Sequence, residues 1–413
     1  MARTPTLGDV VLAGEGAQSA MSITPFIHGS VDVSNSYLVQ TDDGNVLINA
    51  GTAGGGPRHA AAYAALGGPL RYAILTQSHV DHFGGLSALR EPDTVLVAQS
   101  AFPKVRAYWL GLAPFYGRRT MHLWGSILGP QPAVPPPEVQ PDILFDDEME
   151  ISVGGRHFTL LSTPGGETLD SCVVWLPDDG AIFTGNLFGP IFRNLPNLYT
   201  IRGDRARSVE TFLTSLDRVR ACDAELLITG HGEPIRGSAV IRADLDRIAD
   251  AVDYLRTETW KGMNAGRSLH ELMRDIALPP RLRIGEQHGK TAWAVRAIWE
   301  EYAGWFHFRS TTELFDVPAS SVSGDLVNLA GGPAPLIARA RDYLDKARPL
   351  EALHLLETVL DAAPGDATAL SAKRDALAVM LDRASDNLSE IMWLKAEIAG
   401  IEAALAASGG EIS

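Results

Sequence analysis

Short runs rich in β-branched residues alternate with Ala-rich segments between Ile23 and about residue 235, and Gly, Pro and Asp separate them. The apolar runs include residues 35–41, 45–49, 72–76 and 93–98. The first two flank Asp43-Gly44, which is typical of a hairpin turn. An Ala-rich segment at 59–66 fits a helix before the third run. This alternation predicts a mixed α/β fold in which helices cover sheets.

A different pattern begins near residue 333, where apolar residues recur at helical spacing. Pro364-Gly365-Asp366 interrupts the pattern, which resumes over 367–381. We expect helical hairpins of tetratricopeptide-like character, with apolar stripes that pack a core or join two copies of the chain. Residues 129–137 are dense in proline and predict an extended surface excursion.

Composition excludes several classes of protein. The formal net charge is −15 and no basic run is present, so nucleic acid is not expected as a partner. No stretch approaches the ~20 apolar residues of a membrane span, and no signal peptide is recognisable. Cys172 and Cys222 are too few for a disulfide framework. The expectation is a cytoplasmic enzyme that acts on a small molecule and has no membrane partner.

The most informative stretch lies where the run ending at Leu75 gives way to Thr-Gln-Ser-His-Val-Asp-His-Phe-Gly-Gly. Three possible metal ligands, His79, Asp81 and His82, fall within four residues at a strand end. Neutral imidazole and ionised carboxylate suit zinc, manganese or iron. The following Gly84-Gly85 would allow the backbone to turn closely around an ion.

Three further apolar runs also end in a polar residue beside glycine. These residues are Glu167 after Thr-Pro-Gly-Gly, Asn186 after Thr-Gly, and His231 after Thr-Gly. Chance repetition of this arrangement at several strand ends is improbable. The sequence therefore predicts that these side chains converge with His79, Asp81 and His82.

Taken together, these motifs resemble the metallo-β-lactamase superfamily over roughly residues 20–235. A narrower resemblance to the alkylsulfatase branch comes from residues 194–203, 261–266, 278–282 and 288–299. The resemblance implies a four-layer αββα sandwich followed by an all-α domain of helical hairpins. The expected plan is an N-terminal extension at 1–20, a catalytic domain at 21–325 with a lid-like insertion at 101–137, a helical dimerisation domain at 326–407, and a tail at 408–413.

Three positions depart from the superfamily pattern that this chain resembles. Gln77 replaces the first histidine of the metal-binding loop, Asn186 replaces a bridging carboxylate, and Asn49 replaces an aspartate found in many members. Asp81 and Glu167 remain, and their two charges neutralise about one divalent ion. Two separated ions would be held less tightly in such a site.

We therefore expect one firm metal position, an open three-ligand site formed by Asp81, His82 and His231. A second, weaker position would use His79 and Glu167, with Gln77 as a further candidate through its amide oxygen. Asp170 is a candidate for replacement charge, or alternatively a solvated or capping residue. Gln77 and Asn186 are alternatively hydrogen-bonding groups behind the ligands. Zinc is the expected ion, with manganese or iron as alternatives.

An anionic substrate requires cations, and the motif resemblance points to Arg202 as the residue that contacts a sulfate group. Arg207 is a second candidate and Lys290 a third, whereas an ion pair between Arg202 and Asp204 is the structural alternative. Tyr116 belongs to an aromatic cluster in the insertion, which suits either a lid over an apolar substrate tail or an ordinary domain contact.

The sequence thus predicts a metal-dependent hydrolase that cleaves a sulfate-ester-like bond of a small, partly apolar anion by metal-activated water, with Asp81 and Arg202 as the catalytic residues. Cleavage of the S–O or the C–O bond stays open. One alternative is a hydrolase or lyase for a lactone or carboxylic ester with an altered mononuclear site. Another is a non-catalytic binding protein of the same fold. A homodimer through the C-terminal helices is also expected.

Overall fold

The computed structural model describes residues 19–128, 138–205, 207–384 and 386–409. The chain divides into two compact units. The first runs to Arg118 and resumes after the undescribed segment 129–137 to end at Tyr302, and the second contains α6 from Arg119 together with the chain from Ala303. Among the described residues, no helix combines the length and apolar character needed to cross a lipid bilayer.

One sheet follows chain order from β1 to β7. Its strands are β1 (Met21–Ser22), β2 (Ile27–Ser30), β3 (Ser36–Thr41), β4 (Gly44–Ala50), β5 (Leu70–Ile74), β6 (Val95–Gln99) and β7 (Ile143–Phe145). The expected hairpin is confirmed, because β3 and β4 pair antiparallel with Val39 opposite Val46. From β4 to β7 the strands pair in parallel. The helices that follow these strands are α2 (Gly56–Ala64), α3 (Val80–Phe83), α4 (Leu86–Leu89), α5 (Phe102–Gly111) and α6 (Ala113–Leu128).

The second sheet runs in the order β13-β12-β11-β10-β9-β8. Its strands are β8 (Glu148–Val153), β9 (Arg156–Ser162), β10 (Cys172–Leu176), β11 (Ala181–Gly185), β12 (Leu226–Thr229) and β13 (Ile235–Arg236). The helices and 3₁₀ turns of this half are η1 (Pro177–Asp179), α7 (Val209–Ala221), α8 (Ser238–Asn264), α9 (Leu269–Asp275), η2 (Pro280–Leu282) and α10 (Thr291–Ala303). The single parallel pair, β11 with β12, is connected through α7.

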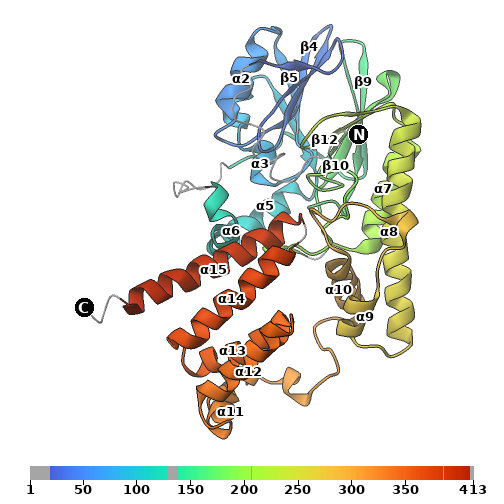
Figure 1. The fold of residues 1–413 in the computed structure, drawn as a ribbon. Helices are drawn as coiled ribbons and strands as arrows, with labels where there is room; N and C mark the ends of the chain where they lie inside the picture. The colour runs from blue at the N-terminus through green and yellow to red at the C-terminus, as the bar shows by residue number, and fades with distance from the viewer. Residues whose placement is uncertain (1–18, 129–137, 206, 385, 410–413) are drawn as a thin grey trace. The chain divides into compact units, whose positions relative to one another are not determined.

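The strands and helices of the first unit form layers (Figure 1), and the side chains of each strand alternate between two differently covered faces. Val46 and Ile48 of β4 pack in a core shared with Phe158 and Phe183 of the second sheet. The intervening Leu47 instead packs in the cluster that contains residues of α4 and α5. The outer face of the second sheet packs against α7 and α8. The predicted four-layer αββα sandwich is therefore confirmed.

The second unit is helical, as the spacing of its apolar residues predicts. It contains η3 (Thr311–Leu314), η4 (Ala319–Val322), α11 (Ser323–Leu329), α12 (Pro333–Asp345), α13 (Pro349–Ala362), α14 (Ala367–Arg383) and α15 (Leu388–Gly409). Asp366 ends the predicted break and caps α14, where its carboxylate accepts a hydrogen bond from Ala369 N at 2.9 Å. Within this unit, Leu356 and Ala372 share one apolar core. The proline-dense residues 129–137 lie outside the described residues.

Helix α2 carries a histidine that is completely buried. The Nδ1 atom of His59 lies 2.7 Å from Ser30 Oγ, and its Nε2 atom lies 3.9 Å from Asp32 Oδ2. Burial lowers the pKa of His59 from 6.5 to about 4, although the Asp32 carboxylate opposes this shift. His59 is therefore neutral in the folded protein near pH 7.

The buried state of His59 predicts a pH dependence of stability. Between pH 6.5 and pH 4 the unfolded chain binds a proton at this residue that the folded protein does not, so the free energy of unfolding decreases as the pH falls. The contribution of His59 is about 3 kcal/mol over this window. Urea unfolding of metal-free protein at several pH values measures it, and His59→Gln is expected to flatten the dependence.

His157→Gln is the matched control, because that side chain is 61% exposed. An unchanged pH dependence in His59→Gln would show that the pKa of His59 is the same in the folded protein as in the unfolded chain.

Candidate metal centre

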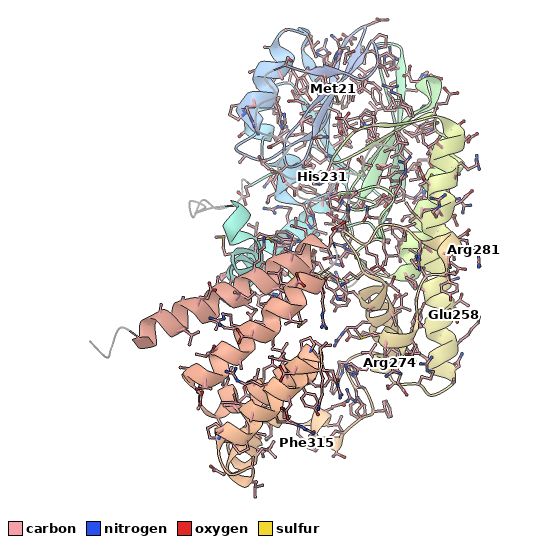
Figure 2. All side chains as sticks on the ribbon, in the orientation of Figure 1. Met21, His231, Glu258, Arg274, Arg281 and Phe315 are labelled. Atoms are coloured by element: carbon pink, nitrogen blue, oxygen red, sulfur yellow. The ribbon has the colours of Figure 1, made fainter. Side chains whose placement is uncertain are left out.

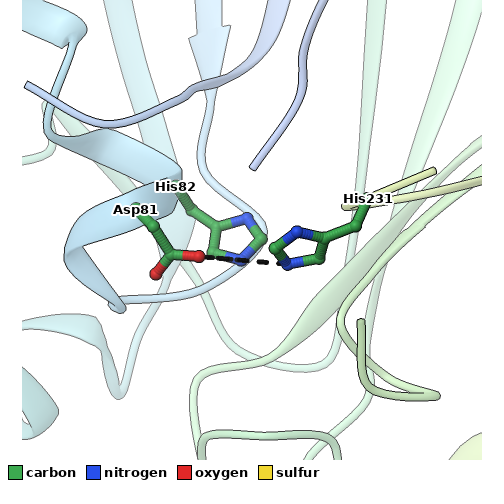
Figure 3. Close-up of side chains that lie close together, drawn as sticks. All are labelled: Asp81, His82 and His231. Carbon is green, nitrogen blue, oxygen red and sulfur yellow. Dashed lines mark ion pairs between the residues drawn. The ribbon is translucent and has the colours of Figure 1, made fainter. Parts of the chain in front are cut away.

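The ends of β5 and β12 bring together one carboxylate and two imidazoles. Asp81 and His82 lie in α3, which begins just after β5, and His231 follows β12 in the other sheet (Figures 2 and 3). Asp81 Oδ2 lies 3.5 Å from His82 Nε2 and 3.9 Å from His231 Nε2. In the part of the chain that the structure describes, these residues form the one group of His, Cys, Asp or Glu whose ligand atoms all lie within 4.8 Å of one another.

The protonation state of this group suits a divalent cation. His231 Nδ1 faces the backbone carbonyl of Val33, which only accepts hydrogen bonds, so Nδ1 carries a proton. The amide nitrogen of Asn186, which only donates, lies 3.0 Å from Nε2, so Nε2 keeps its lone pair. Burial lowers the pKa of His82 to about 4 despite the nearby Asp81. Burial raises the pKa of Asp81, but the neighbouring His82 and His231 outweigh it and leave the pKa below its ordinary value. One carboxylate and two neutral imidazoles fit zinc or a similar ion.

Behind His82, a serine and an asparagine compete for the same ring nitrogen. Ser34 Oγ and Asn49 Nδ2 each lie 3.1 Å from His82 Nδ1. The Asn49 amide cannot turn over freely, because its Oδ1 accepts from Thr76 N at 2.9 Å. An amide nitrogen only donates, so Asn49 favours an unprotonated Nδ1. If a metal binds His82 through Nε2, the Nδ1 atom of His82 must carry the proton. Ser34 Oγ can accept a hydrogen bond from that N–H group.

The neighbouring half of the site is an internal network of ion pairs. His79 Nδ1 lies 3.4 Å from Glu167 Oε2, and His79 Nε2 lies 3.6 Å from Asp204 Oδ2. Burial lowers the pKa of His79, but hydrogen bonds to Asp204 and Glu167 outweigh it and raise the pKa to about 9. His288 Nε2 lies 3.4 Å from Glu167 Oε1. Burial raises the pKa of Glu167, but His288 and His79 hold it well below its ordinary range.

Two amide side chains lie among these ionic groups. Asn186 Nδ2 lies 2.9 Å from Glu167 Oε2 and 3.0 Å from His231 Nε2, so Asn186 hydrogen-bonds to both halves of the site. Gln77 Nε2 lies 3.3 Å from His79 Nδ1. The Asn186 contacts are hydrogen bonds from an amide nitrogen. A protonated His79 Nδ1 is a donor, as is Gln77 Nε2, so the group of Gln77 that can bond to this ring is its amide oxygen.

The candidate substrate-binding residues fall into two places. The guanidinium of Arg202 lies 5.0 Å from the ring centroid of Trp109, which in turn packs on Tyr116 and against the edge of His79. Arg207 lines a cavity of about 90 Å³, together with Glu167, Asp204 and Tyr108.

Lys290 lines a different, more open cavity with Arg283 and Glu286, and its ammonium lies 5.7 Å from the ring of Trp293.

Asp170, the candidate for replacement charge, is buried, and its Oδ1 accepts a hydrogen bond from Ser78 Oγ at 2.9 Å. Burial raises the pKa of Asp170, although the hydrogen bonds of Thr168 and Ser78 oppose the shift.

The predicted site residues did not include His288, Asp204 appeared only as an ion-pair partner of Arg202, and Tyr108 and Trp109 belonged only to the aromatic cluster of the insertion. Asp204 stands two residues after Arg202, and His288 stands two residues before Lys290 in a motif already recognised. Tyr108 donates a hydrogen bond from its hydroxyl to Asp204 Oδ1 at 3.0 Å. The motifs contained the signal for Asp204 and His288, but their side-chain roles depend on the folded arrangement.

Comparison with known protein families agrees with this architecture. Residues 29–231 match the model of the metallo-beta-lactamase superfamily, and residues 268–396 match the model of the alkyl sulfatase dimerisation domain. The chain therefore contains a metallo-β-lactamase superfamily domain. An alkyl sulfatase dimerisation domain follows it.

Individual relatives extend the comparison. A linear primary-alkylsulfatase from a Pseudomonas species is 30% identical over 210 residues, which make up 49% of this chain and 39% of that protein. An (R)-specific secondary-alkylsulfatase from Pseudomonas is 22% identical over 385 residues, or 84% of this chain and 57% of that protein. This chain thus spans about two fifths to three fifths of the length of these relatives.

A solved structure supports the fold over both units. The stereoselective inverting sec-alkylsulfatase from Pseudomonas aligns with 93% of this chain and 66% of its own, at 21% identity and a TM-score of 0.81. Both the sandwich and the helical C-terminal region are therefore shared with that protein.

The contact between Asn49 and His82 predicts that a carboxylate at position 49 tightens metal binding. In Asn49→Asp the second oxygen would accept the proton of His82 Nδ1 and leave Nε2 free to bind. We expect the affinity for Zn²⁺ to rise by roughly tenfold. Competition with a chromophoric chelator measures the affinity.

Asn45→Asp provides a matched control, because Asn45 is also buried on β4 but hydrogen-bonds to Gly67 O at the other end of the strand. If Asn49→Asp binds Zn²⁺ no more tightly than the native protein, Ser34 alone sets the protonation of His82.

Proposed function

We propose that the protein is a metal-dependent hydrolase that cleaves a sulfate-ester bond in a small, partly apolar anion. The convergence of Asp81, His82 and His231 on one point is the observation that carries the proposal. A divalent ion held there would supply Lewis acidity toward the ester. The alkylsulfatase names of the relatives support sulfate as the anionic group.

We further propose that the chain holds one metal ion. Both ring nitrogens of His79 already face carboxylates, and the Asn186 amide hydrogen-bonds to Glu167 where a superfamily member would have a bridging carboxylate. An ion in this half would have to displace these partners, whereas an ion between Asp81, His82 and His231 would displace only the Asn186 amide from His231 Nε2. Zinc is the proposed ion because the donor set is two imidazoles and one carboxylate.

The proposed roles of the other residues follow from their charge and shape. Arg202 and Arg207 would bind the sulfate oxygens, since a guanidinium offers parallel donors to an oxyanion. Arg207 lines the cavity beside Glu167, which is large enough for a small anion at about 90 Å³. Trp109 and Tyr116 present aromatic surface next to Arg202, which suits the apolar part of the substrate.

Loss of Asp81 tests the proposed hydrolase. In chelator-washed native protein we expect about one divalent ion per chain by elemental analysis. Asp81→Ala removes the negative ligand, so tight metal is expected to be lost and sulfate release from a linear alkyl sulfate to fall by roughly 10³-fold or more. Asp178→Ala is the control, because that carboxylate is 61% exposed.

The companion double variant, Gln77→His with Asn186→Asp, restores the superfamily residues and should raise the metal content toward two. Two tightly held ions in the native protein would contradict the single-ion proposal. Absence of metal, with no effect of Asp81→Ala on any activity, would favour the non-catalytic binding protein.

We also propose a homodimer formed through the C-terminal helical unit. The family model over residues 268–396 supports it, and several large apolar side chains of this unit are exposed. Phe308 is 88% exposed, Leu329 is 85% exposed, and Trp305 is 74% exposed. Phe315, labelled in Figure 2, is 68% exposed. Apolar surface of this kind favours burial against a second copy.

Light scattering of the full chain tests the dimer. We expect twice the chain mass of 44.3 kDa for the native protein and a shift toward the monomer for Leu329→Asp. Val240→Asp is the control, because Val240 is 47% exposed on α8 in the other unit. A native mass of one chain would refute the proposed dimer.

A further inference from the structure

The loop at residues 31–35, between β2 and β3, contacts both histidines of the candidate metal centre. Val33 O accepts the proton of His231 Nδ1, and Ser34 Oγ lies 3.1 Å from His82 Nδ1. The two ligands come from different sheets, yet neighbouring residues of one loop contact both rings. The position of this loop therefore decides how both imidazoles are directed.

The same loop also fixes the backbone that carries His231. Asn35 N donates to Gly230 O at 2.8 Å, and Asn35 Nδ2 donates to Gly232 O at 3.0 Å. Ser34 Oγ donates to Gly230 O at 3.3 Å. The carbonyl groups on both sides of His231 are thus hydrogen-bonded to residues 34 and 35, so a shift of the loop would move the ligand with it.

At its other end the loop is anchored by a buried carboxylate. Asp32 is 4% exposed, and its Oδ1 accepts from Arg58 Nη2 at 2.7 Å. Its Oδ2 accepts from Thr52 N at 3.2 Å and from Thr52 Oγ1 at 2.5 Å. A buried carboxylate is costly unless such partners compensate it, so Asp32 holds a narrowly defined position.

The space around Asp32 is equally restricted. A Cβ atom on Gly55 would lie 2.0 Å from Asp32 Oδ2, whereas a Cβ on the adjacent Gly54 would meet no atom within 4 Å. Gly55 has φ −78°, which any residue can adopt, so the restriction there is one of space alone. Substitution of Gly55 by alanine should therefore displace the Asp32 carboxylate, whereas the same substitution at Gly54 should leave it in place.

We propose that Asp32, held by Thr52 and Arg58, is a positioning residue that sets the metal affinity of Asp81, His82 and His231 through the loop at 31–35. Its carboxylate lies against Thr52 and Arg58 rather than against the candidate metal ligands. It acts by keeping Val33 O and Ser34 Oγ where the two imidazoles need hydrogen-bond partners. Outer partners of metal-binding histidines change affinity by about 10–100-fold when they are lost.

The first test compares Gly55→Ala with Gly54→Ala in the full chain, using Co²⁺ as the probe. Chelator competition gives the affinity, and the visible absorption of bound Co²⁺ reports the ligand geometry. We expect Gly55→Ala to bind Co²⁺ roughly tenfold more weakly or worse, with an altered spectrum. Gly54→Ala should match the native protein in both. Equal affinities and spectra for the two variants would overturn the proposal.

A second pair of variants removes the anchor by charge rather than by space. Asp32→Asn and Arg58→Ala should both weaken Co²⁺ binding, because each breaks the Asp32–Arg58 ion pair. Asp179→Asn is the matched control: its carboxylate pairs with Arg156 at 2.7 and 2.8 Å, on β9 rather than at this loop. Thermal unfolding without metal, measured for every variant, separates general destabilisation from loss of positioning.

The outcomes distinguish this inference from the proposed function on which it rests. Failure of the native protein to bind Co²⁺ would refute both. Tight binding by the native protein, with Asp32→Asn falling no further than Asp179→Asn, would refute the positioning role and leave the proposed hydrolase intact. Weaker binding in Asp32→Asn, Arg58→Ala and Gly55→Ala, with unfolding temperatures equal to those of the controls, is the expected result.

Discussion

Hydrogen bonds between the segment 31–37 and the segment 229–232 align the two sheets where the candidate ligands meet. The apolar core between the sheets is large but non-directional, so it stabilises their contact without specifying register. Directional bonds supply that register: Asn35 N donates to Gly230 O, and Tyr37 Oη donates to Thr229 O at 2.8 Å. A metal centre whose ligands come from both sheets depends on this alignment.

The two halves of the site differ in how their charge is balanced. In the half with Asp81, the carboxylate faces His82, whose pKa burial lowers to about 4, and His231, whose Nε2 accepts a hydrogen bond from Asn186, so a negative charge is left for a cation to neutralise. In the other half, Glu167 and Asp204 both face His79, and Arg207 adds a further positive charge nearby. This second group is close to neutral by itself. A divalent ion therefore gains more from the first half than from the second.

The sequence predicted those parts of the site that local patterns encode. Asp81 and His82 follow a buried strand within one short segment, and His231 follows another, so strand ends and glycines were enough to find them. The fold could be predicted for the same reason, because neighbouring residues of a strand point to opposite faces of its sheet. Val46 and Ile48 face the other sheet, whereas Leu47 faces the covering helices.

Contacts between distant segments could not be predicted in this way. Asp204 meets His79 across more than a hundred residues, and although it lies close to the motif that contains Arg202, the motif does not show that its carboxylate reaches His79. In the motif that contains both His288 and Lys290, charge favoured Lys290 as an anion ligand, yet the structure brings His288 to Glu167. The tautomer of His82 likewise depends on Asn49 and Ser34, which lie on other strands and loops.

The two amide replacements at Gln77 and Asn186 have a common electrostatic consequence. The Asn186 amide nitrogen lies 2.9 Å from Glu167 Oε2. A carboxylate at residue 186 would therefore repel Glu167 unless a cation lay between the two groups. The amide removes that requirement because its nitrogen donates to Glu167 and to His231 Nε2. Glu167 is then balanced by His79, His288 and Arg207 rather than by metal. Under the single-ion proposal, the amide at 186 would thus remove the need for an ion in this half, while the other half keeps its group of Asp81, His82 and His231.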